Sequence, residues 1–211
     1  MKNLARDGRT QETASSILRA AREVFAEKGF GGARVDEIAR RAGVNKATIY
    51  YHIGDKRSLY EAAIHNVVSR TRQLMQEGTE HEGSPKDKLA VIIRTFAKVV
   101  DENPHVGPLM LREIASGGKH LPAAVLSDIA GIIGLLTGIT EEGRRLGQFS
   151  EINPFLLYIM IVGMIILFKV SAPLRKRSVE TLGAVVDTND AVAGPVADSI
   201  ERLVLNAVRL N

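Results

Sequence analysis

Residues 35–56, VDEIARRAGVNKATIYYHIGDK, decide the fold of this chain. The first part of the stretch has one apolar face at the helical period, formed by Val35, Ile38, Ala39 and Ala42. Gly43 follows directly, and a glycine there can take the left-handed conformation that ends a helix. Asn45 can then cap a second helix by accepting a hydrogen bond from an early backbone N–H. The stretch therefore predicts a helix-turn-helix, followed by a further helix that Asp55 caps.

The second helix of this pair is expected to begin near Lys46 and to have two unlike faces. The side that can pack against the first helix carries Ile49, Tyr50 and Ile53. The outward side carries Lys46, Ala47, Thr48, Tyr51 and His52. A helix exposed only to water usually presents Glu, Lys and Gln, whereas this mixture suits phosphates, base edges and thymine methyl groups in a major groove. The outward face therefore indicates DNA binding.

This region resembles the TetR family of one-component regulators, with dense similarity from about Thr13 to Ile64. Residues 17–30, ILRAAREVFAEKGF, resemble the family's first helix with its Gly-Phe ending, and residues 44–52, VNKATIYYH, resemble its recognition helix. The resemblance implies an all-α fold of about nine helices, three of them in an N-terminal DNA-binding unit. It also implies a ligand-responsive regulator, usually a repressor, that forms a homodimer through its last two helices.

Two positions depart from the family pattern. Arg34 stands where Thr or Ser usually caps the second helix, so we expect no hydroxyl cap and an arginine able to reach a phosphate. Asn45 stands where many members have Ser, and it caps equally well. Tyr50 either packs in the core or reaches a phosphate through its hydroxyl, and Lys56 adds a cation at a helix N-terminus. The predicted DNA-contacting residues are Arg34, Val35, Asn45, Lys46, Ala47, Thr48, Tyr50, Tyr51, His52 and Lys56.

The basic charge of the chain is concentrated in its first 60 residues. These contain 12 Lys and Arg against 7 Asp and Glu, whereas residues 61–211 contain 16 against 17. Lysines scattered evenly over a surface would not give this division, but a DNA-binding unit would. The chain has no cysteine, which excludes disulfides and thiolate metal sites and fits a reducing interior. Residues 1–16 contain no apolar secretory stretch, so we expect a cytoplasmic protein.

The rest of the chain also has helical patterns and no convincing strand. Besides the helix-turn-helix, the predicted helices are about Thr13–Lys28, Lys56–Gln76, Pro85–Glu102, His105–Ser116, 122–147, Asn153–Val170 and Pro195–Leu210. Residues 171–194 are expected to form a loop, with or without a short helical piece. We expect residues 1–55 to form the DNA-binding domain and residues 56–211 to form a ligand-binding and dimerisation domain.

Residues 155–168, FLLYIMIVGMIILF, contain no charged side chain. As a helix this segment would be about 21 Å long, which is too short to cross a hydrocarbon core of roughly 30 Å. A helix that is apolar on all sides must instead be buried, and burial between two subunits would achieve this. With the family's pattern, this predicts a homodimer through about 153–170 and 195–210, and no membrane contact.

The family resemblance also implies a ligand cavity among the helices that follow the fourth. The residues predicted to line it are Phe96, His105, Met110, Glu113, Ile129, Phe155, Tyr158 and Met164. Thioethers and aromatic rings suit a mainly apolar ligand, but they equally suit ordinary core packing. His105 is either a ligand contact or a histidine at a helix start. Glu113 with Arg112 forms a pocket pair, a buried pair or two exposed charges.

No arrangement of residues in the sequence indicates catalysis or a metal site. The five histidines are scattered, and the pairs Ser127–Asp128 and Glu141–Glu142 lack the partners of a nucleophile or an acid–base dyad. We therefore expect neither an enzyme nor a cofactor. Two function classes remain: a regulator that binds a double-stranded operator and a small-molecule effector, and a helical architectural or protein-interaction module that binds DNA without operator specificity. The charge division and the outward face of the third helix favour the regulator.

Overall fold

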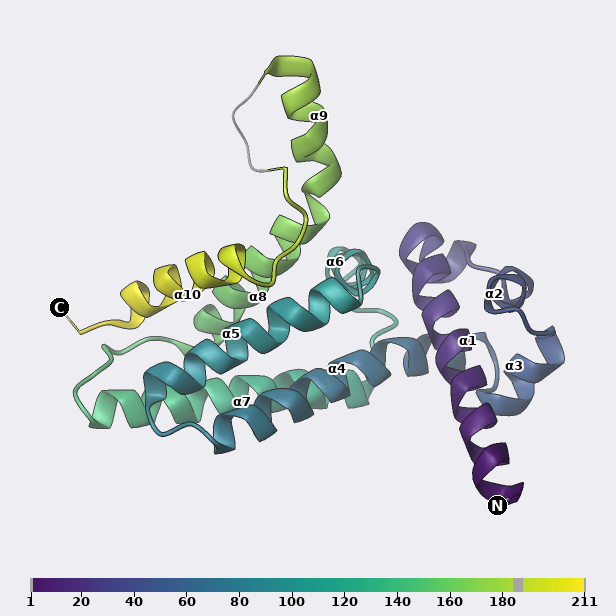
Figure 1. Ribbon diagram of the computed structural model, residues 1–211, viewed down its shortest axis with the longest axis horizontal. Coiled ribbons are helices and arrows are strands. Elements are labelled where there is room, and N and C mark those ends of the chain that lie inside the picture. Colours follow the sequence, from purple (N-terminus) through teal and green to yellow (C-terminus); the bar gives the residue numbers. More distant parts are fainter. Residues whose placement is uncertain (1, 184–187, 211) are drawn as a thin grey trace. The chain divides into compact units, whose positions relative to one another are not determined.

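The computed structural model describes residues 2–183 and 188–210, and within these ranges the chain forms ten helices and no strand (Figure 1). The helices are α1 Lys2–Gly32, α2 Val35–Ala42, α3 Lys46–His52, α4 Lys56–Glu80, α5 Pro85–Glu102, α6 Val106–Ala115, α7 Ala123–Arg145, α8 Pro154–Val170, α9 Ala172–Leu182 and α10 Pro195–Val208. The all-α fold that the sequence predicts is confirmed.

Three helix boundaries differ from the expectation. The α1 helix begins at Lys2 rather than Thr13, because its first turns have no apolar stripe that a pattern could reveal. It also continues past a kink at Gly29, where φ is 68°. The α4 helix runs to Glu80 rather than Gln76.

The α9 helix occupies part of the segment that was expected to be a loop, so the described residues contain ten helices instead of about nine. Its first turn is fixed by Arg175, whose Nη1 donates to the Ser171 hydroxyl at 2.6 Å. The guanidinium of Arg175 also lies over the Phe168 ring, 3.9 Å from its centroid. Residues 184–187 of the expected loop lie outside the described residues.

The chain divides into two compact units that are not continuous in sequence. Residues 1–67 and 108–125 form the first, and residues 68–107 and 126–211 form the second. The α4, α6 and α7 helices therefore each contribute residues to both units. The boundary expected between residues 55 and 56 divides the DNA-binding domain from the ligand-binding and dimerisation domain by function, and it stays a prediction.

The first unit packs α1 against α2, and α2 against α3. Its apolar residues at the helical period have no exposed surface; they include Ile17, Val24, Phe25, Ile38, Ile49 and Leu59. Each such side chain contributes about 1.5–3 kcal/mol when it leaves water. This core holds the turn between α2 and α3 in place.

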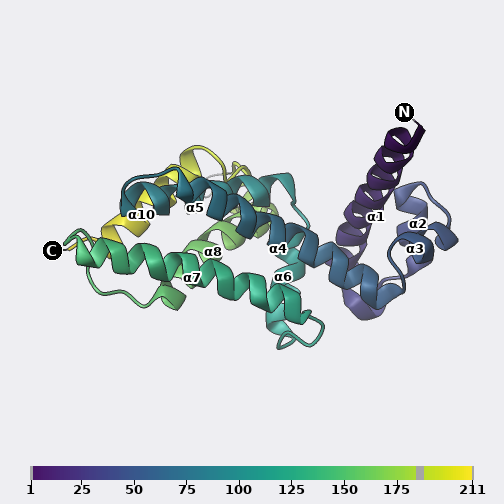
Figure 2. The ribbon, with the colours of Figure 1, turned by 90° about the horizontal axis from the view of Figure 1, so that it is seen from below.

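In the second unit α5 packs against both α8 and α10, and these two pack against each other (Figure 2). The shared core includes Leu89, Ile93, Leu157, Ile165 and Val204. By length and composition alone α7 could cross a membrane, and α8 with α9, bent by 53°, passes the same criterion as a pair. Core helices of soluble proteins share these properties, and α5, α8 and α10 meet in such a core.

Gly143 of α7 leaves the least room for a Cβ atom among the glycines described in the second unit. A Cβ atom there would overlap the ring of Phe149, which is 4% exposed. We expect Gly143→Ala to lower the free energy of unfolding by about 1–3 kcal/mol, because the ring must move. Gly138→Ala is the matched control on the same helix, where a Cβ meets nothing within 4 Å. Because alanine has a higher helix propensity than glycine, this control should raise the free energy of unfolding by about 0.5–1 kcal/mol. Urea unfolding measures both variants, and equal effects of the two substitutions would contradict the steric argument.

Candidate DNA-binding site

The turn between α2 and α3 has the capping geometry that its residues predict. Gly43 has φ of 70°, and its N–H donates to the Arg40 carbonyl at 3.3 Å. The Asn45 carboxamide oxygen accepts from the backbone N–H of Thr48 at 2.8 Å and from the Thr48 hydroxyl at 2.9 Å. Asp55 caps α4 in the same way, accepting from the Ser58 N–H at 2.8 Å. These bonds fix where α3 begins and which way its side chains face.

The outward face of α3 is exposed. Tyr51 is 85% exposed and Tyr50 47% exposed, while Ile49 is fully buried beneath them. The Tyr51 ring meets the His52 ring edge-on at 5.1 Å between centroids. Tyr50 is therefore a surface residue in this subunit, not a core residue, which leaves the phosphate-contact alternative. Ala47 is also exposed.

The remaining predicted DNA-contacting residues surround this face, with one exception. Arg34 is exposed at the N-cap of α2 and its side chain makes no capping bond, as expected. Val35 is 8% exposed, so its side chain belongs to the core of the first unit. We therefore leave Val35 out of the set that we propose to face DNA.

Two of the predicted cations have partners within the subunit. The Lys46 ammonium lies 3.0 Å from the Asp36 carboxylate, and this bond raises the pKa of Lys46 above its ordinary value. The Lys56 ammonium donates to the Gly31 carbonyl at 3.3 Å and lies 4.8 Å from the centroid of the Phe30 ring. Both cations remain near the α3 face, but each must exchange or share a partner to bind a phosphate.

We expect Asp36→Ala to strengthen binding to duplexes of any sequence. The Asp36 side chain is 70% exposed, and its removal frees Lys46 and deletes a charge that repels phosphate. Because one exposed pair is worth little, the gain should be about threefold to tenfold at low salt, falling as salt rises. Fluorescence anisotropy with operator and scrambled duplexes measures it. Glu102→Ala, on α5, is the control; unchanged or weaker binding of Asp36→Ala would show that the pair with Lys46 does not restrain the lysine.

A network of ion pairs holds α1 against α2. Arg41 contacts Glu23 at 2.9 Å, Glu27 at 2.7 Å and Glu37 at 2.8 Å, and Lys28 contacts Glu37 at 2.5 Å. The hydrogen bond with Glu27 raises the pKa of Arg41, and the bond with Lys28 lowers the pKa of Glu37. Exposed pairs of this kind add little stability singly, but the network orients α2 on α1.

The first unit also contains a polar cluster, buried at Tyr60 and Glu113, that joins α6 to α1 and α4 and is here called the α6 clasp. It consists of Tyr60, Arg112, Glu113 and His120. The Tyr60 hydroxyl donates to the Glu113 carboxylate, which is 3% exposed. Burial, and then the contact with Glu113, raises the pKa of the Tyr60 hydroxyl above its ordinary value.

The other clasp bonds reach the loop after α6 and the end of α1. The His120 backbone N–H donates to Glu113 at 3.1 Å, and the His120 ring stacks on Phe30 at 4.7 Å between centroids. Arg112 donates to the carbonyls of Ala26 at 2.9 Å and Glu27 at 3.1 Å. The clasp therefore fixes the later part of α6 to the two helices that carry the helix-turn-helix.

These contacts change the interpretation of Glu113 as a ligand contact. Its carboxylate already accepts hydrogen bonds from Tyr60 and His120. Of the three alternatives for Glu113, the structure therefore has the buried one, although the partners are Tyr60 and His120 and not Arg112. Met110 is half-buried in the same unit as Glu113, whereas the other six predicted ligand residues belong to the second unit. The eight residues are therefore not brought together in one compact unit.

The six ligand candidates of the second unit differ in exposure. Phe96, Tyr158 and Met164 are half-buried and pack against its core, and burial raises the pKa of Tyr158. Ile129 and His105 are half-buried. Phe155 is 53% exposed, so its ring faces away from any internal cavity of this subunit.

A broad apolar face is left uncovered on α8 and α10. Its exposed side chains include Leu156 at 61%, Leu167 at 58% and Leu203 at 59%. A groove of about 630 Å³ runs between the two helices, lined among others by Met164, Phe168 and Ile200. Contiguous exposed apolar surface of this kind is typical of an interface between subunits. It lies on the segments that the sequence predicts for dimerisation.

The comparisons with known proteins agree with this geometry. The sequence model for "Bacterial regulatory proteins, tetR family" matches residues 17–63, which include α2 and α3. The fatty acid metabolism regulator protein of Bacillus subtilis is 27% identical over 135 residues, 64% of this chain and 70% of that protein. The transcriptional regulator RutR of Escherichia coli is 23% identical over 194 residues, 92% of this chain and 89% of its own length.

Among solved structures, the regulator FadR of Bacillus subtilis in complex with stearoyl-CoA has the same fold. Its TM-score is 0.70 at 23% identity, covering 92% of this chain and 99% of that one. The helix-turn-helix motif, the capped recognition helix and the helical body thus agree with the sequence and the fold of known regulators. Residues 17–63 therefore match the TetR family of bacterial regulatory proteins, and the described residues have the fold of a solved regulator.

Proposed function

We propose that this protein is a cytoplasmic homodimeric repressor that binds a pseudo-palindromic operator and leaves it when a mainly apolar small molecule binds. The proposal rests on two observations, the exposed α3 face on a fixed helix-turn-helix and the uncovered apolar face on α8 and α10. The first supplies the DNA contact, and the second supplies the two-fold partner. The function is binding and regulation rather than catalysis, as in the related regulators.

The DNA contacts divide by chemistry. The residues that we propose to read bases are Ala47, Thr48, Tyr51 and His52, because they lie on the outward side of α3. The residues that we propose to contact phosphates are Arg34, Asn45, Lys46, Tyr50 and Lys56. Two recognition helices related by two-fold symmetry would meet half-sites about 34–36 Å apart or a near multiple of this.

The effector is proposed to bind in the second unit, close to α8. Half-buried aromatic and thioether side chains there, including Phe96, Tyr158 and Met164, are adaptable to an apolar ligand. Two of the similar proteins reported above are a fatty acid metabolism regulator and a FadR bound to stearoyl-CoA. These similarities make a long acyl chain the first effector to test.

The α6 helix supports a mechanical route from effector to DNA. At its start, a Cβ on Gly107 would lie 3.2 Å from Val170 of α8, so the two helices are in close contact there. At its end, the α6 clasp bonds to α1 and α4. A ligand that displaces α8 would therefore move α6, and α6 would alter the spacing of the recognition helices. Such coupling requires only that ligand and operator prefer different conformations of one dimer.

We expect stearoyl-CoA or stearate to release the dimer from its operator. The operator is first selected from random duplexes, and release is followed by fluorescence anisotropy with coenzyme A alone as the control. Linkage requires the ligand to bind the free dimer more tightly than the operator-bound dimer, by the same factor that it weakens DNA binding. Equal ligand affinity for the two forms would refute repression by release. Equal affinity for operator and scrambled duplexes would instead favour an architectural DNA-binding module.

A further inference from the structure

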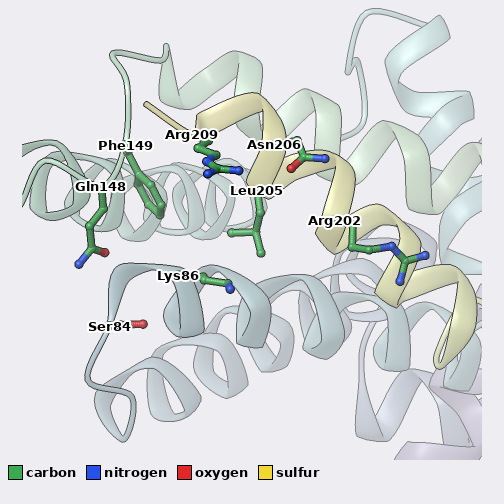
Figure 3. A pocket seen from close by; sticks show the side chains of 8 residues that line it. All are labelled: Ser84, Lys86, Gln148, Phe149, Arg202, Leu205, Asn206 and Arg209. Atoms are coloured by element: carbon green, nitrogen blue, oxygen red, sulfur yellow. The ribbon is translucent and has the colours of Figure 1, made fainter. Parts of the chain in front are cut away.

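A second cavity lies in the second unit, and none of the residues proposed for the effector lines it. Its volume is about 650 Å³, within the range of small-molecule sites. Three elements line it: the start of α5 with Ser84 and Lys86, the segment after α7 with Gln148 and Phe149, and the last turns of α10. The residues of this segment are Arg202, Leu205 and Asn206 of α10 and Arg209, which directly follows that helix. Figure 3 shows the side chains of these lining residues, with Leu205 pointing into the space between Phe149 and Lys86.

The cavity has a fixed wall. The Phe149 N–H donates to the Gly143 carbonyl at 3.2 Å, and the Phe149 backbone forms an isolated antiparallel bridge with Arg209. The next residue, Ser150, donates from its N–H to the Val208 carbonyl at 2.8 Å. The end of α7 is thereby tied to the end of α10, and the Phe149 ring is buried between them. A site held in this way is formed before a ligand binds, which lowers the entropic cost of binding.

The charge of the lining is unbalanced. Neighbouring cations on the same helices have carboxylate partners: Lys88 contacts Glu142 at 2.8 Å, and Arg94 contacts Glu201 at 2.9 Å. Across residues 2–183 and 188–210, no carboxylate lies within salt-bridge distance of Lys86, Arg202 or Arg209, the three cations of the cavity. The polar bond that Arg202 makes is with the Ser199 hydroxyl at 2.8 Å.

The rest of the lining is suited to a ligand that is more than an inorganic ion. Phe149 and Leu205 provide carbon surface, and the amides of Gln148 and Asn206 can both donate and accept hydrogen bonds. Arginine and lysine side chains bind phosphate oxygens through charge-assisted hydrogen bonds. Asp87, the carboxylate next to the lining, is held by the Ser84 hydroxyl at the α5 cap.

We propose that this cavity binds an organic phosphate, with the phosphate between Lys86, Arg202 and Arg209 and a flat or apolar group against Phe149 and Leu205. From the C-terminal part of the chain, the site uses residues 202, 205 and 206 of α10 and residue 209 just after it. The groove beside α8 is lined by a different set from α10, namely Pro195, Val196, Ser199, Ile200 and Leu203. An organic phosphate could therefore bind while the α8 and α10 face is covered by a second subunit. The proposal goes beyond the effector of the proposed function.

The test uses phenyl phosphate as the probe and the full-length protein labelled with nitrogen-15. Titration followed by heteronuclear NMR should shift the backbone signals of Gln148, Phe149 and Arg209 with saturation. Phenol and inorganic phosphate, which each supply one half of the probe, should bind more weakly than the whole. Shifts confined to the groove between α8 and α10, or phenol binding as tightly as phenyl phosphate, would overturn the proposal.

Variants separate a specific site from general attraction to a basic protein. Arg209→Ala and Arg202→Ala should each raise the dissociation constant for phenyl phosphate about tenfold, because each removes a charge-assisted bond. Arg177→Ala, which removes an exposed cation of α9, should leave it unchanged. Arg209→Lys keeps the charge and should recover part of the affinity, which distinguishes lost binding from a damaged fold. Equal weakening in Arg177→Ala and Arg209→Ala would overturn the site. Operator release by an acyl chain is measured separately, so either proposal can fail alone.

Discussion

Leu203→Glu should convert the dimer into monomers and weaken binding to a full operator by at least about a hundredfold. Leu203 is 59% exposed on α10 and lines the groove beside Met164 and Leu167 of α8. In a two-fold interface the substitution occurs twice, and each copy would bury an unpaired carboxylate against apolar side chains. A monomer then binds one half-site at a time and loses the additional affinity that two linked DNA-binding units have for a full operator. Light scattering after size exclusion measures the mass, and anisotropy measures the operator affinity.

The control for this substitution is Leu126→Glu. Leu126 is 53% exposed on α7, outside the α8 and α10 face, so the same charge should leave the mass and the affinity unchanged. A Leu203→Glu protein that stays dimeric would show that another surface forms the dimer. If it becomes monomeric yet binds a full operator as tightly as the wild type does, dimerisation is not required for recognition.

Glu113→Ala should lower the free energy of unfolding by about 2–4 kcal/mol and uncouple effector binding from operator release. The substitution leaves the Tyr60 hydroxyl and the His120 N–H without their shared acceptor in a buried place. It also breaks the bond that joins α6 to α4. Urea unfolding gives the first quantity, and the ratio of ligand affinities for free and operator-bound protein gives the second.

Tyr60→Phe is the matched variant, because it keeps the ring contacts with Phe25 and Phe30 and removes only the hydroxyl. It should cost about 1–1.5 kcal/mol, and the double variant should be less destabilised than the sum of the two, since the residues share one bond. Strict additivity would mean that the Tyr60 bond contributes nothing. A Glu113→Ala protein that stays folded and is still released by the effector to the normal extent would remove the α6 clasp from the coupling route.

The helix-turn-helix could be predicted from sequence because its determinants are local. A helical period of apolar residues, a glycine able to adopt positive φ at position 43 and a capping side chain at Asn45 act within a few residues. The outward position of Tyr51 follows from the same period. The N-terminal turns of α1 were missed, and the α9 helix was only an open alternative, since a helix without an apolar stripe has no such local signal.

Contacts between distant segments could not be predicted in this way. Glu113 and Tyr60 are 53 positions apart, and only the closure of the fold decides that one buried carboxylate meets that hydroxyl. The second cavity likewise joins the start of α5 to the end of α10. Its three cations look like ordinary surface charges in the sequence. Nothing local shows that, among the described residues, nearby cations such as Lys88 and Arg94 have carboxylate partners whereas these three have none.

The sequence by itself therefore determined the helical class, the recognition helix and the concentration of basic charge beside it. These depend on the helical period, on caps and on composition, which act over one or two turns of chain. The tertiary structure alone decided that Val35 is buried while Leu203 is left exposed, and which cations of the described residues have a carboxylate partner. Those outcomes depend on which faces the other helices cover, and that is settled only when distant segments pack together.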